Sequence, residues 1–306
     1  MKKIYYITII SLAVLFTSCD YVANPYPAKN ANISDTTSCS ISAFPAVASH
    51  IKKILMEDFT AHTCTNCPKA ARSIHIVDST YPGQINTVAV HCSSLAAPSS
   101  SFDAADPGSY MDDYRTTLGT TYDNSFGASA YGLPEAMINR KDYNMVTLSH
   151  LKLYPFSSYV AGIFAESSVV DLQINLNYDV STRKICCAIR DSFLTAVTGN
   201  YKLVALITQD SIIGWQDDAD HNPSNVSNYV FNHVLRDAIT PTGAWGEPLI
   251  GNGSSAGLKQ IRHFGYTIPA AFKNINCIPR NCHIVAYIYN TATYEIIQSE
   301  DVKVIP

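Results

Sequence analysis

The sequence lacks the short motifs by which several large classes of protein are identified. It has no glycine-rich phosphate loop and no Ser-His-Asp motif of the hydrolase type. Pro68, and not a histidine, follows its one Cys-x-x-Cys pair, which excludes covalent haem attachment at that pair. These absences argue against nucleotide-dependent enzymes, serine hydrolases and c-type cytochromes.

The chain also begins without an apolar run long enough to cross a bilayer. Its first apolar run, Ile4–Phe16, is shorter than the ~20 residues that a membrane-spanning helix needs. Lys2 and Lys3 precede the run, and small residues separate it from Cys19. This pattern predicts a signal peptide over residues 1–18 and therefore export of the protein.

The cysteine that directly follows these small residues resembles the lipobox of bacterial lipoproteins. The resemblance implies that Cys19 becomes the acylated first residue of the mature chain, whose acyl chains attach the protein lastingly to a membrane. Phe16 stands where the lipobox more often has leucine, so a simple secretory signal with an unmodified Cys19 stays open as an alternative. Asp20 is a residue that some bacteria read as an inner-membrane retention signal.

An excess of basic charge is absent as well. Without Lys2 and Lys3, 19 of the 21 Lys and Arg residues remain against 25 Asp and Glu, which gives a net charge of −6 and excludes nucleic acid as a partner. The full chain is 47% hydrophobic, and the 288 residues that follow the signal peptide (306 minus 18) suffice for two domains. We expect a flexible tether over residues 19–49 and folded domains over residues 50–166 and 167–306.

The most informative motif is an apolar strand that leads into the Cys-x-x-Cys pair. The strand at Ile51–Phe59 precedes Cys64 and Cys67, and a helix follows. Unpaired N–H groups at a helix N-terminus favour a thiolate on the first sulfur, so Cys64 is a candidate nucleophile and Cys67 its resolving partner. The same pair could form half of a zinc site, but no second Cys or His pair stands at compatible spacing, and we expect no metal and no cofactor.

The residues after the cysteines predict a helix and a second buried strand. Apolar positions at helical spacing are Ala70, Ala71, Ile74 and Val77. Asn86–His91 is an apolar strand, and the strand–helix–strand order predicts a right-handed parallel crossover. Because parallel strands end at the same edge of a sheet, Cys92 should lie on the side of Cys64. It is either a third redox thiol or a small buried apolar residue.

A long polar insertion over residues 93–129 follows and could cover the thiols. We expect it to contain a helix over residues 107–118 with Pro107 at its start. Pro134 then forms an X-Pro turn that leads into a strand, and a hydrophobic helical stretch spans residues 148–164.

From Val169 onward the hydrophobic period changes to two. Short alternating or apolar runs occur at residues 169–176, 185–191, 201–209, 229–236, 261–268, 283–290 and 294–304. Runs of this kind between turn residues predict an antiparallel β-sandwich of the Ig-like kind. The fold class is thus α/β in the first domain and all-β in the second.

Two further clusters in the second half are interpreted as structural features and not as functional sites. Asp217, Asp218 and Asp220 resemble the start of a calcium loop, but Pro223 and Tyr229 stand where such a loop needs Gly and Glu. Cys277 and Cys282 flank a turn and could close a small structural loop.

The first domain resembles thioredoxins beyond its two cysteines. Asp58-Phe59 precedes Cys64 at the spacing found in thioredoxins, and Gly132-Leu133-Pro134 is similar to their Gly-Ile-cis-Pro. The resemblance implies that Asp58 is a buried proton relay and Pro134 a cis proline beside the disulfide. It makes Cys64 the attacking thiol and Cys67 the resolving thiol.

The sequence departs from the thioredoxin pattern next to the first cysteine. Thr63 stands where thioredoxins have tryptophan, and Pro68 follows the pair instead of lying inside it. These changes leave the substrate and the reduction potential open. His62 is either a nearby cation that lowers the pKa of Cys64 or a solvated loop histidine.

Nearly the whole chain after the tether resembles a more particular group, the twenty-eight-kilodalton outer-membrane-protein-related lipoproteins of Bacteroides-like bacteria. The segments that carry this resemblance are Met56–Thr60, Gly132–Arg140, Asn232–Arg236, Trp245–Leu249 and Val285–Asn290. The resemblance implies a lipid-anchored protein of the outer membrane with a thioredoxin-like domain and a β-rich domain. The biochemical activity of that group is poorly defined.

Two functions from different classes follow. The first is thiol–disulfide exchange in the cell envelope with a protein thiol or disulfide as partner. The second is binding or adhesion of a surface ligand by a non-enzymatic lipoprotein, in which the thioredoxin-like domain is a scaffold and the Cys64–Cys67 bond is permanent.

Overall fold

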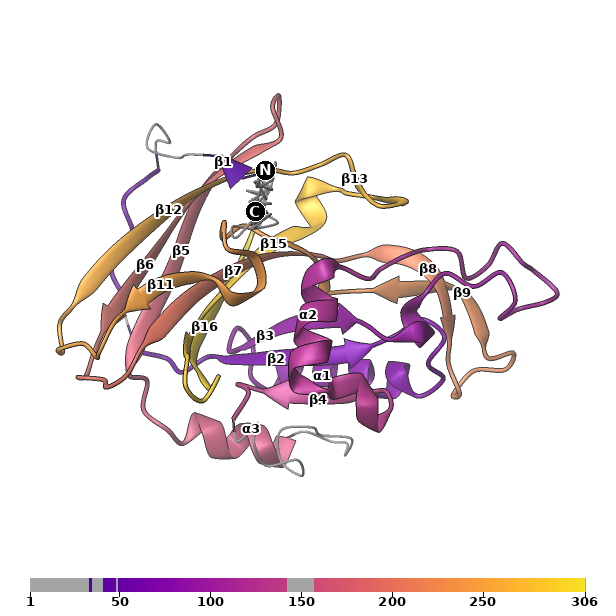
Figure 1. Cartoon of the computed structure of the whole chain (residues 1–306), viewed down its shortest axis with the longest axis horizontal. Helices are drawn as coiled ribbons and strands as arrows, with labels where there is room; N and C mark the ends of the chain where they lie inside the picture. The colour runs from indigo at the N-terminus through magenta and orange to yellow at the C-terminus, as the bar shows by residue number, and fades with distance from the viewer. Residues whose placement is uncertain (1–32, 35–40, 48, 142–156, 306) are drawn as a thin grey trace, which may run out of the picture.

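The computed structural model describes residues 33–34, 41–47, 49–141 and 157–305. The expected signal peptide, the lipid attachment at Cys19 and most of the tether lie outside these residues. Figure 1 shows a four-stranded sheet on the left and a larger sheet that runs from the centre into a part with helices. Among the helices that are described, none is long and apolar enough to span a membrane.

The first half is built on a parallel strand–helix–strand unit, as the sequence predicts. Its elements are β2 (Ile54–Thr60), α1 (Cys67–Thr80), β3 (Ile85–His91) and β4 (Glu135–Ile138). Strand β2 pairs with β3 in parallel and with β4 antiparallel. Every residue of β2 and β3 is buried, so apolar residues of both strands face both sides of the sheet, and the polar residues among them, such as Glu57 and Asp58, are buried too.

Alternate residues of β2 face two helices on opposite sides of the sheet. Ile54 and Met56 pack with residues of α1, whereas Leu55 and Phe59 pack with residues of α2 (Thr117–Phe126). Because successive side chains of a strand point to opposite faces, Glu57 lies on the face of α2 and Asp58 on the face of α1. This alternation positions the two acids for different roles.

The larger sheet continues from the first half into the second. Its order is β16-β15-β7-β10-β3-β2-β4, with β11 paired to β7 beside this path. The added strands are β7 (Tyr201–Gln209), β10 (Val234–Ala238), β11 (Glu247–Ile250), β15 (Cys282–Asn290) and β16 (Ile296–Lys303). Strand β10 joins the halves, since it pairs in parallel with β3 and antiparallel with β7.

A second sheet packs against the β7–β15 part of the first, so the second half is β-rich as expected. Its order is β1-β12-β6-β5, and all of its pairs are antiparallel. The strands are β1 (Ile33–Ser34), β5 (Val170–Asp179), β6 (Lys184–Phe193) and β12 (Lys259–Thr267). The main core fills the space between the sheets, with Ile189 and Phe264 from one and Ile207 and Ile284 from the other.

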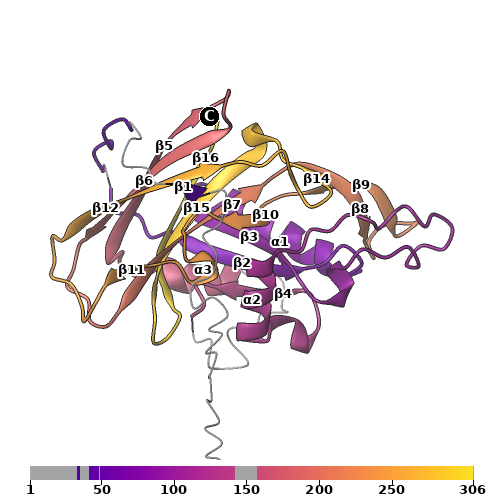
Figure 2. The ribbon, with the colours of Figure 1, turned by 45° about the horizontal axis from the view of Figure 1, so that its top comes forward.

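The remaining elements lie around these sheets, and the turned view of Figure 2 shows the hairpin β8–β9 at the end of the molecule away from β5, β6 and β12. Two strand pairs are β8 (Ile212–Asp217) with β9 (Asn225–Phe231) and β13 (Ala271–Phe272) with β14 (Ile275–Asn276). The other helices are α3 (Ser157–Phe164), η1 (Ser94–Ala96), η2 (Ala128–Tyr131), η3 (Gly243–Trp245) and η4 (Pro279–Asn281).

Two sequence predictions were wrong about where elements begin and end. The helix expected over residues 107–118 is not there, because Thr116 caps α2 by accepting a hydrogen bond from the Gly119 N–H at 2.9 Å. The strand expected over residues 229–236 is broken. His233 adopts φ 58° and its N–H donates to Asp210 Oδ1, which separates β9 from β10. The helical stretch expected over residues 148–164 is described only from residue 157.

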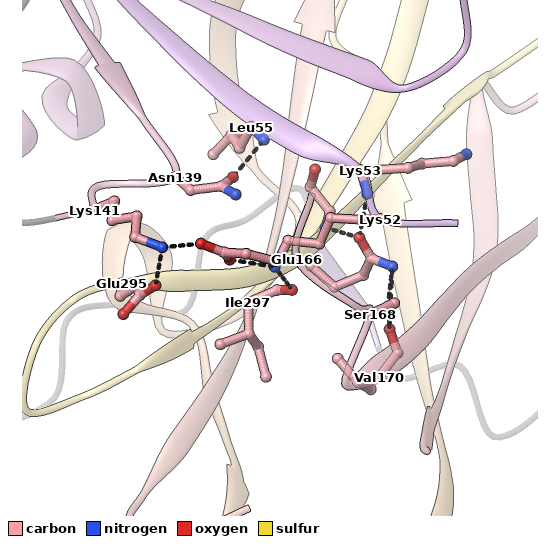
Figure 3. Close-up of polar contacts among 12 residues, drawn as sticks. Lys52, Lys53, Leu55, Asn139, Lys141, Glu166, Ser168, Val170, Glu295 and Ile297 are labelled. Carbon is pink, nitrogen blue, oxygen red and sulfur yellow. Dashed lines mark hydrogen bonds and ion pairs between the residues drawn. The ribbon is translucent and has the colours of Figure 1, made fainter. Parts of the chain in front are cut away.

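A polar network ties the first half to the turn before β16 (Figure 3). Asn139 Oδ1, just beyond β4, accepts a hydrogen bond from the Leu55 N–H at 2.8 Å. Lys141 forms an ion pair with Glu166 after α3, and its Nζ lies 3.9 Å from Glu295 Oε1. The network therefore fixes α3 and the β15–β16 turn against the strands of the first half.

Gly246 is a position where a side chain should be strongly destabilising. Its φ is +64°, and an added Cβ would lie 2.1 Å from the backbone oxygen of Leu203 on β7. We expect Gly246→Ala to lower the free energy of unfolding by more than about 3 kcal/mol in urea denaturation, because backbone strain and a backbone clash add. Gly243→Ala is the matched control, since its φ is +68° with no atom within 4 Å, and should cost about 1–2 kcal/mol. Equal losses in the two variants would contradict the clash.

Candidate functional site

Cys64 and Cys67 form a disulfide where β2 passes into α1. Their Cα atoms are 5.4 Å apart, and the Cys67 N–H donates to the Cys64 carbonyl at 3.1 Å. Asn66 is the N-cap of α1 and Pro68 lies in its first turn, where the missing N–H of proline does no harm. The sulfur pair therefore lies at the helix N-terminus, as the sequence predicts.

The hairpin β8–β9 covers one side of this disulfide. The Gln216 side chain donates from Nε2 to the carbonyl of Cys64 at 3.1 Å, and the Asp217 N–H donates to the His62 carbonyl at 2.9 Å. Thr65 Oγ1 donates to Asp217 Oδ2 at 2.8 Å. These bonds join the cysteine loop to residues about 150 positions away in the sequence.

The polar insertion covers the other side, which confirms the expectation that it shields the thiols. Thr63 Oγ1 donates to the Leu95 carbonyl of η1 at 2.7 Å. Ala96 packs in one apolar cluster with Cys64 and Cys67. Cys64 is 5% exposed and Cys67 1% exposed, so a partner reaches the disulfide only when part of this cover moves.

Asp58 is a buried acid on the α1 face of β2. Its side chain is 4% exposed, and its Oδ1 has no hydrogen-bond partner in the described part of the chain. Burial raises the pKa of Asp58 to about 7, because an unpaired carboxylate is poorly solvated in the interior. Near neutral pH the carboxyl is thus populated in both its protonated and its charged form.

Asp58 and Cys67 line the same cavity, which has a volume of about 440 Å³. It lies between α1, the strands β2 and β3, and the hairpin β8–β9, and Gln216 and His91 also line it. Both ring nitrogens of His91 lack a hydrogen-bond partner among the described residues. Burial lowers the pKa of His91 to about 3, with smaller contributions from His62 and Arg236, so the imidazole is neutral.

The segment that contains Leu133 and Pro134 also reaches the site, through Leu133. The Leu133–Pro134 peptide bond is cis, as the resemblance to thioredoxins implies. Pro134 directly precedes β4, in which Glu135 is paired with Phe59 of β2. Leu133 packs against the apolar cluster of the two cysteines, so the segment before β4 forms part of the wall around the disulfide.

His62 is neither a solvated loop residue nor a cation. It is 1% exposed, its Nε2 lies 3.2 Å from the Ala97 carbonyl oxygen, and its ring centroid lies 5.7 Å from Tyr110 and 5.6 Å from Tyr114. Burial lowers the pKa of His62, so the ring is neutral near pH 7. Its contacts give it a packing role in the cover over the cysteines.

Cys92 lies after β3, as expected, but its thiol belongs to another cluster. It is 2% exposed and packs with residues such as Phe59 and Tyr122 on the α2 side. Burial, followed by the charge of Asp123, raises the pKa of Cys92. A thiol that is buried and protonated is a poor nucleophile, which favours the reading as a buried apolar residue.

The acidic cluster after β8 has a charged partner that the sequence did not reveal. Arg72 of α1 donates from Nη1 to Asp218 Oδ2 at 2.7 Å and also pairs with Asp220. Arg72 contributes to holding the pKa of Asp218 below its usual range, against an opposing effect of burial. The cluster therefore attaches the β8–β9 region to the helix of Cys67. Nothing in the local sequence of Arg72 signals this pairing.

Comparisons with known proteins identify a family and a fold. The family model described as outer membrane protein Omp28 matches residues 119–305. No curated protein matches the chain significantly in sequence. Among the solved structures that match, HBP35 of Porphyromonas gingivalis is 14% identical with a TM-score of 0.58, over 83% of this chain and 76% of that chain. A domain of the outer membrane lipoprotein Omp28 from Porphyromonas gingivalis is 17% identical with a TM-score of 0.31, over 45% of this chain and 90% of that chain.

Proposed function

We propose that this chain, which belongs to the outer membrane protein Omp28 family, is a lipid-anchored protein, and that it exchanges disulfides through Cys64 and Cys67. The family model covers more than half of the chain and places the protein at the outer membrane. In this proposal Cys19 carries the lipid, and residues 19–49 connect it to the folded part.

The arrangement of the first half supports a thioredoxin-like site over residues 50–166. The parallel pair β2–β3, the crossover helix α1 and the antiparallel strand β4 occur in the order that such a site needs. The disulfide lies at the N-terminus of α1, where unpaired N–H groups stabilise a thiolate. Residues 167–306 form the β-sandwich domain of this proposal.

The observation that carries the proposal is the unpartnered carboxyl of Asp58 in the cavity that Cys67 also lines. A purely structural disulfide does not need a buried acid beside it, and a buried acid without a partner is costly. With a pKa raised by burial to about 7, Asp58 can take a proton from a thiol and return it at neutral pH.

The exchange then proceeds in two balanced steps from the reduced form. The Cys64 thiolate attacks a disulfide of the partner, forms a mixed disulfide and releases one partner sulfur, which takes up a proton. Asp58 accepts the proton of the Cys67 thiol. The Cys67 thiolate attacks Cys64, closes the Cys64–Cys67 bond and releases the second partner sulfur.

A second function is favoured by the burial of the disulfide. With 5% exposure, Cys64 is less accessible than an exchanging thiol needs to be in its resting state. Under this alternative the Cys64–Cys67 bond is permanent, and the protein binds a surface ligand without redox chemistry.

The two functions differ in the reduction potential and in the trapping of partners. We expect Cys67→Ala to accumulate mixed disulfides through Cys64 on non-reducing gels of envelope extracts, because the resolving step is lost. We expect the wild-type bond to have a potential above about −300 mV. A lower potential together with no trapped species would reject exchange and leave the binding function.

Cys187→Ala is the matched control for these measurements. Cys187 is a free, fully buried cysteine of the main core, so its loss should leave trapping unchanged. The double variant Cys64→Ser/Cys67→Ser separates the functions further. If no partner is trapped and this variant binds a surface ligand as tightly as the wild type does, the result supports the binding function, in which the fold is a scaffold.

A further inference from the structure

We propose that Cys277 and Cys282 are a second redox pair, in which Cys277 is the attacking thiol and the buried Arg236 stabilises its thiolate. The pair is independent of the Cys64–Cys67 site, since it belongs to the core between the two sheets of the second half. In the structure both cysteines are reduced.

The two sulfur atoms are held close to one another by the chain around them. Cys277 Sγ lies 3.6 Å from Cys282 Sγ, and Cys282 Sγ lies 3.4 Å from the Ile278 carbonyl oxygen. The short helix η4 fills the loop between the two residues. A disulfide needs the sulfurs to approach to about 2.05 Å, which is a small movement from this starting point.

Backbone hydrogen bonds fix both ends of the loop. The Cys277 N–H donates to the Ala270 carbonyl at 2.8 Å, and the Val304 N–H donates to the Cys282 carbonyl at 2.9 Å. Arg183 donates from Nη2 to the Cys277 carbonyl at 3.0 Å. The thiols are therefore placed by the fold and do not meet by chance motion of a loose loop.

Arg236 supplies a cation that has few partners of its own. It is 4% exposed, and its Nε and Nη1 have no hydrogen-bond partner in the described part of the chain. Its Nη2 donates to the carbonyl of Phe272 in β13 at 3.1 Å, and β13 pairs with β14, which ends directly before Cys277. The guanidinium carbon lies 4.9 Å from the ring centroid of Phe272, but a buried guanidinium without an anionic partner is costly, and the charge of a Cys277 thiolate would offset that cost.

The electrostatics distinguish the two thiols. The hydrogen bond from Cys282, with the charges of Arg236 and Arg183, lowers the pKa of Cys277 despite its burial. The pKa of Cys282 is raised by its bond to Cys277 and by burial. Cys282 Sγ donates to the Ile278 carbonyl oxygen at 3.4 Å, which only a protonated thiol can do, so Cys277 is the thiol that reacts first and Cys282 is the one that resolves.

The oxidant is a low-molecular-weight disulfide, which reaches the pair only when the η4 loop moves, since Cys277 is 4% and Cys282 0% exposed. The Cys277 thiolate attacks one of its sulfurs and forms a mixed disulfide, and the other sulfur leaves and takes up a proton. Cys282 loses its proton to solvent and attacks Cys277, which closes the Cys277–Cys282 bond and releases the second small thiol. The two protein thiols lose two electrons, and the small disulfide is reduced to two thiols.

The test uses the full chain with Cys64→Ser and Cys67→Ser, so that its result does not depend on the proposed exchange site. After incubation with glutathione disulfide, the protein is unfolded, alkylated and analysed by peptide mass. We expect Cys277 and Cys282 to be protected from alkylation in one peptide that is two hydrogens lighter. Cys92 and Cys187, which are buried and free, should stay alkylated as controls. Alkylation of all four cysteines would overturn the proposal.

Single variants test which thiol attacks. With Cys282→Ser we expect a glutathione adduct to accumulate on Cys277, whereas Cys277→Ser should form an adduct on Cys282 at least ~10-fold more slowly. Arg236→Met should slow the Cys277 adduct by about the same factor, and Arg236→Lys should restore part of the rate. If Arg236→Met does not fold, the pH profile of Cys277 alkylation in the native Cys282→Ser variant decides. Equal adduct rates, or a Cys277 profile at the ordinary cysteine pKa, would overturn the assignment.

Discussion

Replacing Arg140 with methionine is expected to lower the free energy of unfolding by about 3–5 kcal/mol, since it leaves a buried carboxylate without its partner. The Arg140 and Glu57 side chains are 0% and 2% exposed. Arg140 Nε donates to Glu57 Oε2 at 2.7 Å and Nη2 donates to Glu57 Oε1 at 2.5 Å. This two-bond geometry is the strongest form of an arginine–carboxylate pair.

Arg140 makes other contacts besides its ion pair with Glu57, and its replacement removes these as well. Its Nη2 also donates to Tyr287 Oη of β15 at 3.0 Å. The guanidinium carbon lies 4.9 Å from the ring centroid of Tyr122 and 4.8 Å from that of Phe126 in α2. Cation–π contacts of a desolvated cation contribute about 2 kcal/mol or more. Arg140 thus connects β2, α2 and β15, and we expect its loss to weaken both halves together.

Urea denaturation followed by circular dichroism measures the loss, with Arg115→Met as the control. Arg115 pairs with Asp113, but its side chain is 35% exposed and Lys273 also pairs with the same acid. An exposed pair of this kind contributes at most about 1 kcal/mol. If Arg140→Met costs no more than Arg115→Met, the buried pair is not what holds the halves together.

Local sequence patterns predicted the strands and the helix of the site, but not the contacts that these elements make with distant parts of the chain. The apolar runs of β2 and β3 and the helical spacing of α1 are properties of short segments, so the parallel unit and the place of Cys64 and Cys67 could be predicted. The pair of Arg140 with Glu57 joins residues 83 positions apart. Periodicity carries no information on such a pairing, although both residues stand in segments that carry the family resemblance.

The residues that cover the disulfide could not be predicted from local sequence patterns either. Gln216 reaches the carbonyl of Cys64 only because β10 joins β3 and so brings the β8–β9 hairpin to the first half. Alternation in residues 201–236 predicts strands but does not state which strand becomes the neighbour of which. The break at His233 depends on the hydrogen bond that its N–H donates to Asp210 Oδ1, which is also a contact between residues that are apart in the sequence.

Asp58→Asn should remove a strong pH dependence of stability. The pKa of Asp58 is raised from its ordinary value of 3.8 to about 7 in the folded protein, so between these pH values only the folded state keeps the proton. The unfolded state then binds fewer protons, and stability falls as the pH rises from about 4 to about 7. The contribution is fully present below pH 4 and is lost above pH 7.

An asparagine at position 58 cannot ionise, so the variant should lack this fall. Relative to the wild type, it should gain a few kcal/mol in urea denaturation at pH 8 and nothing at pH 4. Asp191→Asn is the control, because burial also raises the pKa of Asp191, to about 6, but that residue lies in β6 and not in the cavity. Both variants should flatten the pH profile of stability.

Only Asp58→Asn should affect the chemistry of the disulfide. We expect release of a model disulfide from Cys64 to slow by about 10²-fold at pH 7, since Cys67 loses the group that accepts its proton. In the wild type this step should rise with pH through about 7, and in the variant that rise should disappear. The opposite outcome is an unchanged rate of release of the model disulfide together with a flattened pH profile of stability. Asp58 would then be a buried acid without a role in proton transfer. The cavity that it shares with Cys67 would in that case favour the binding function.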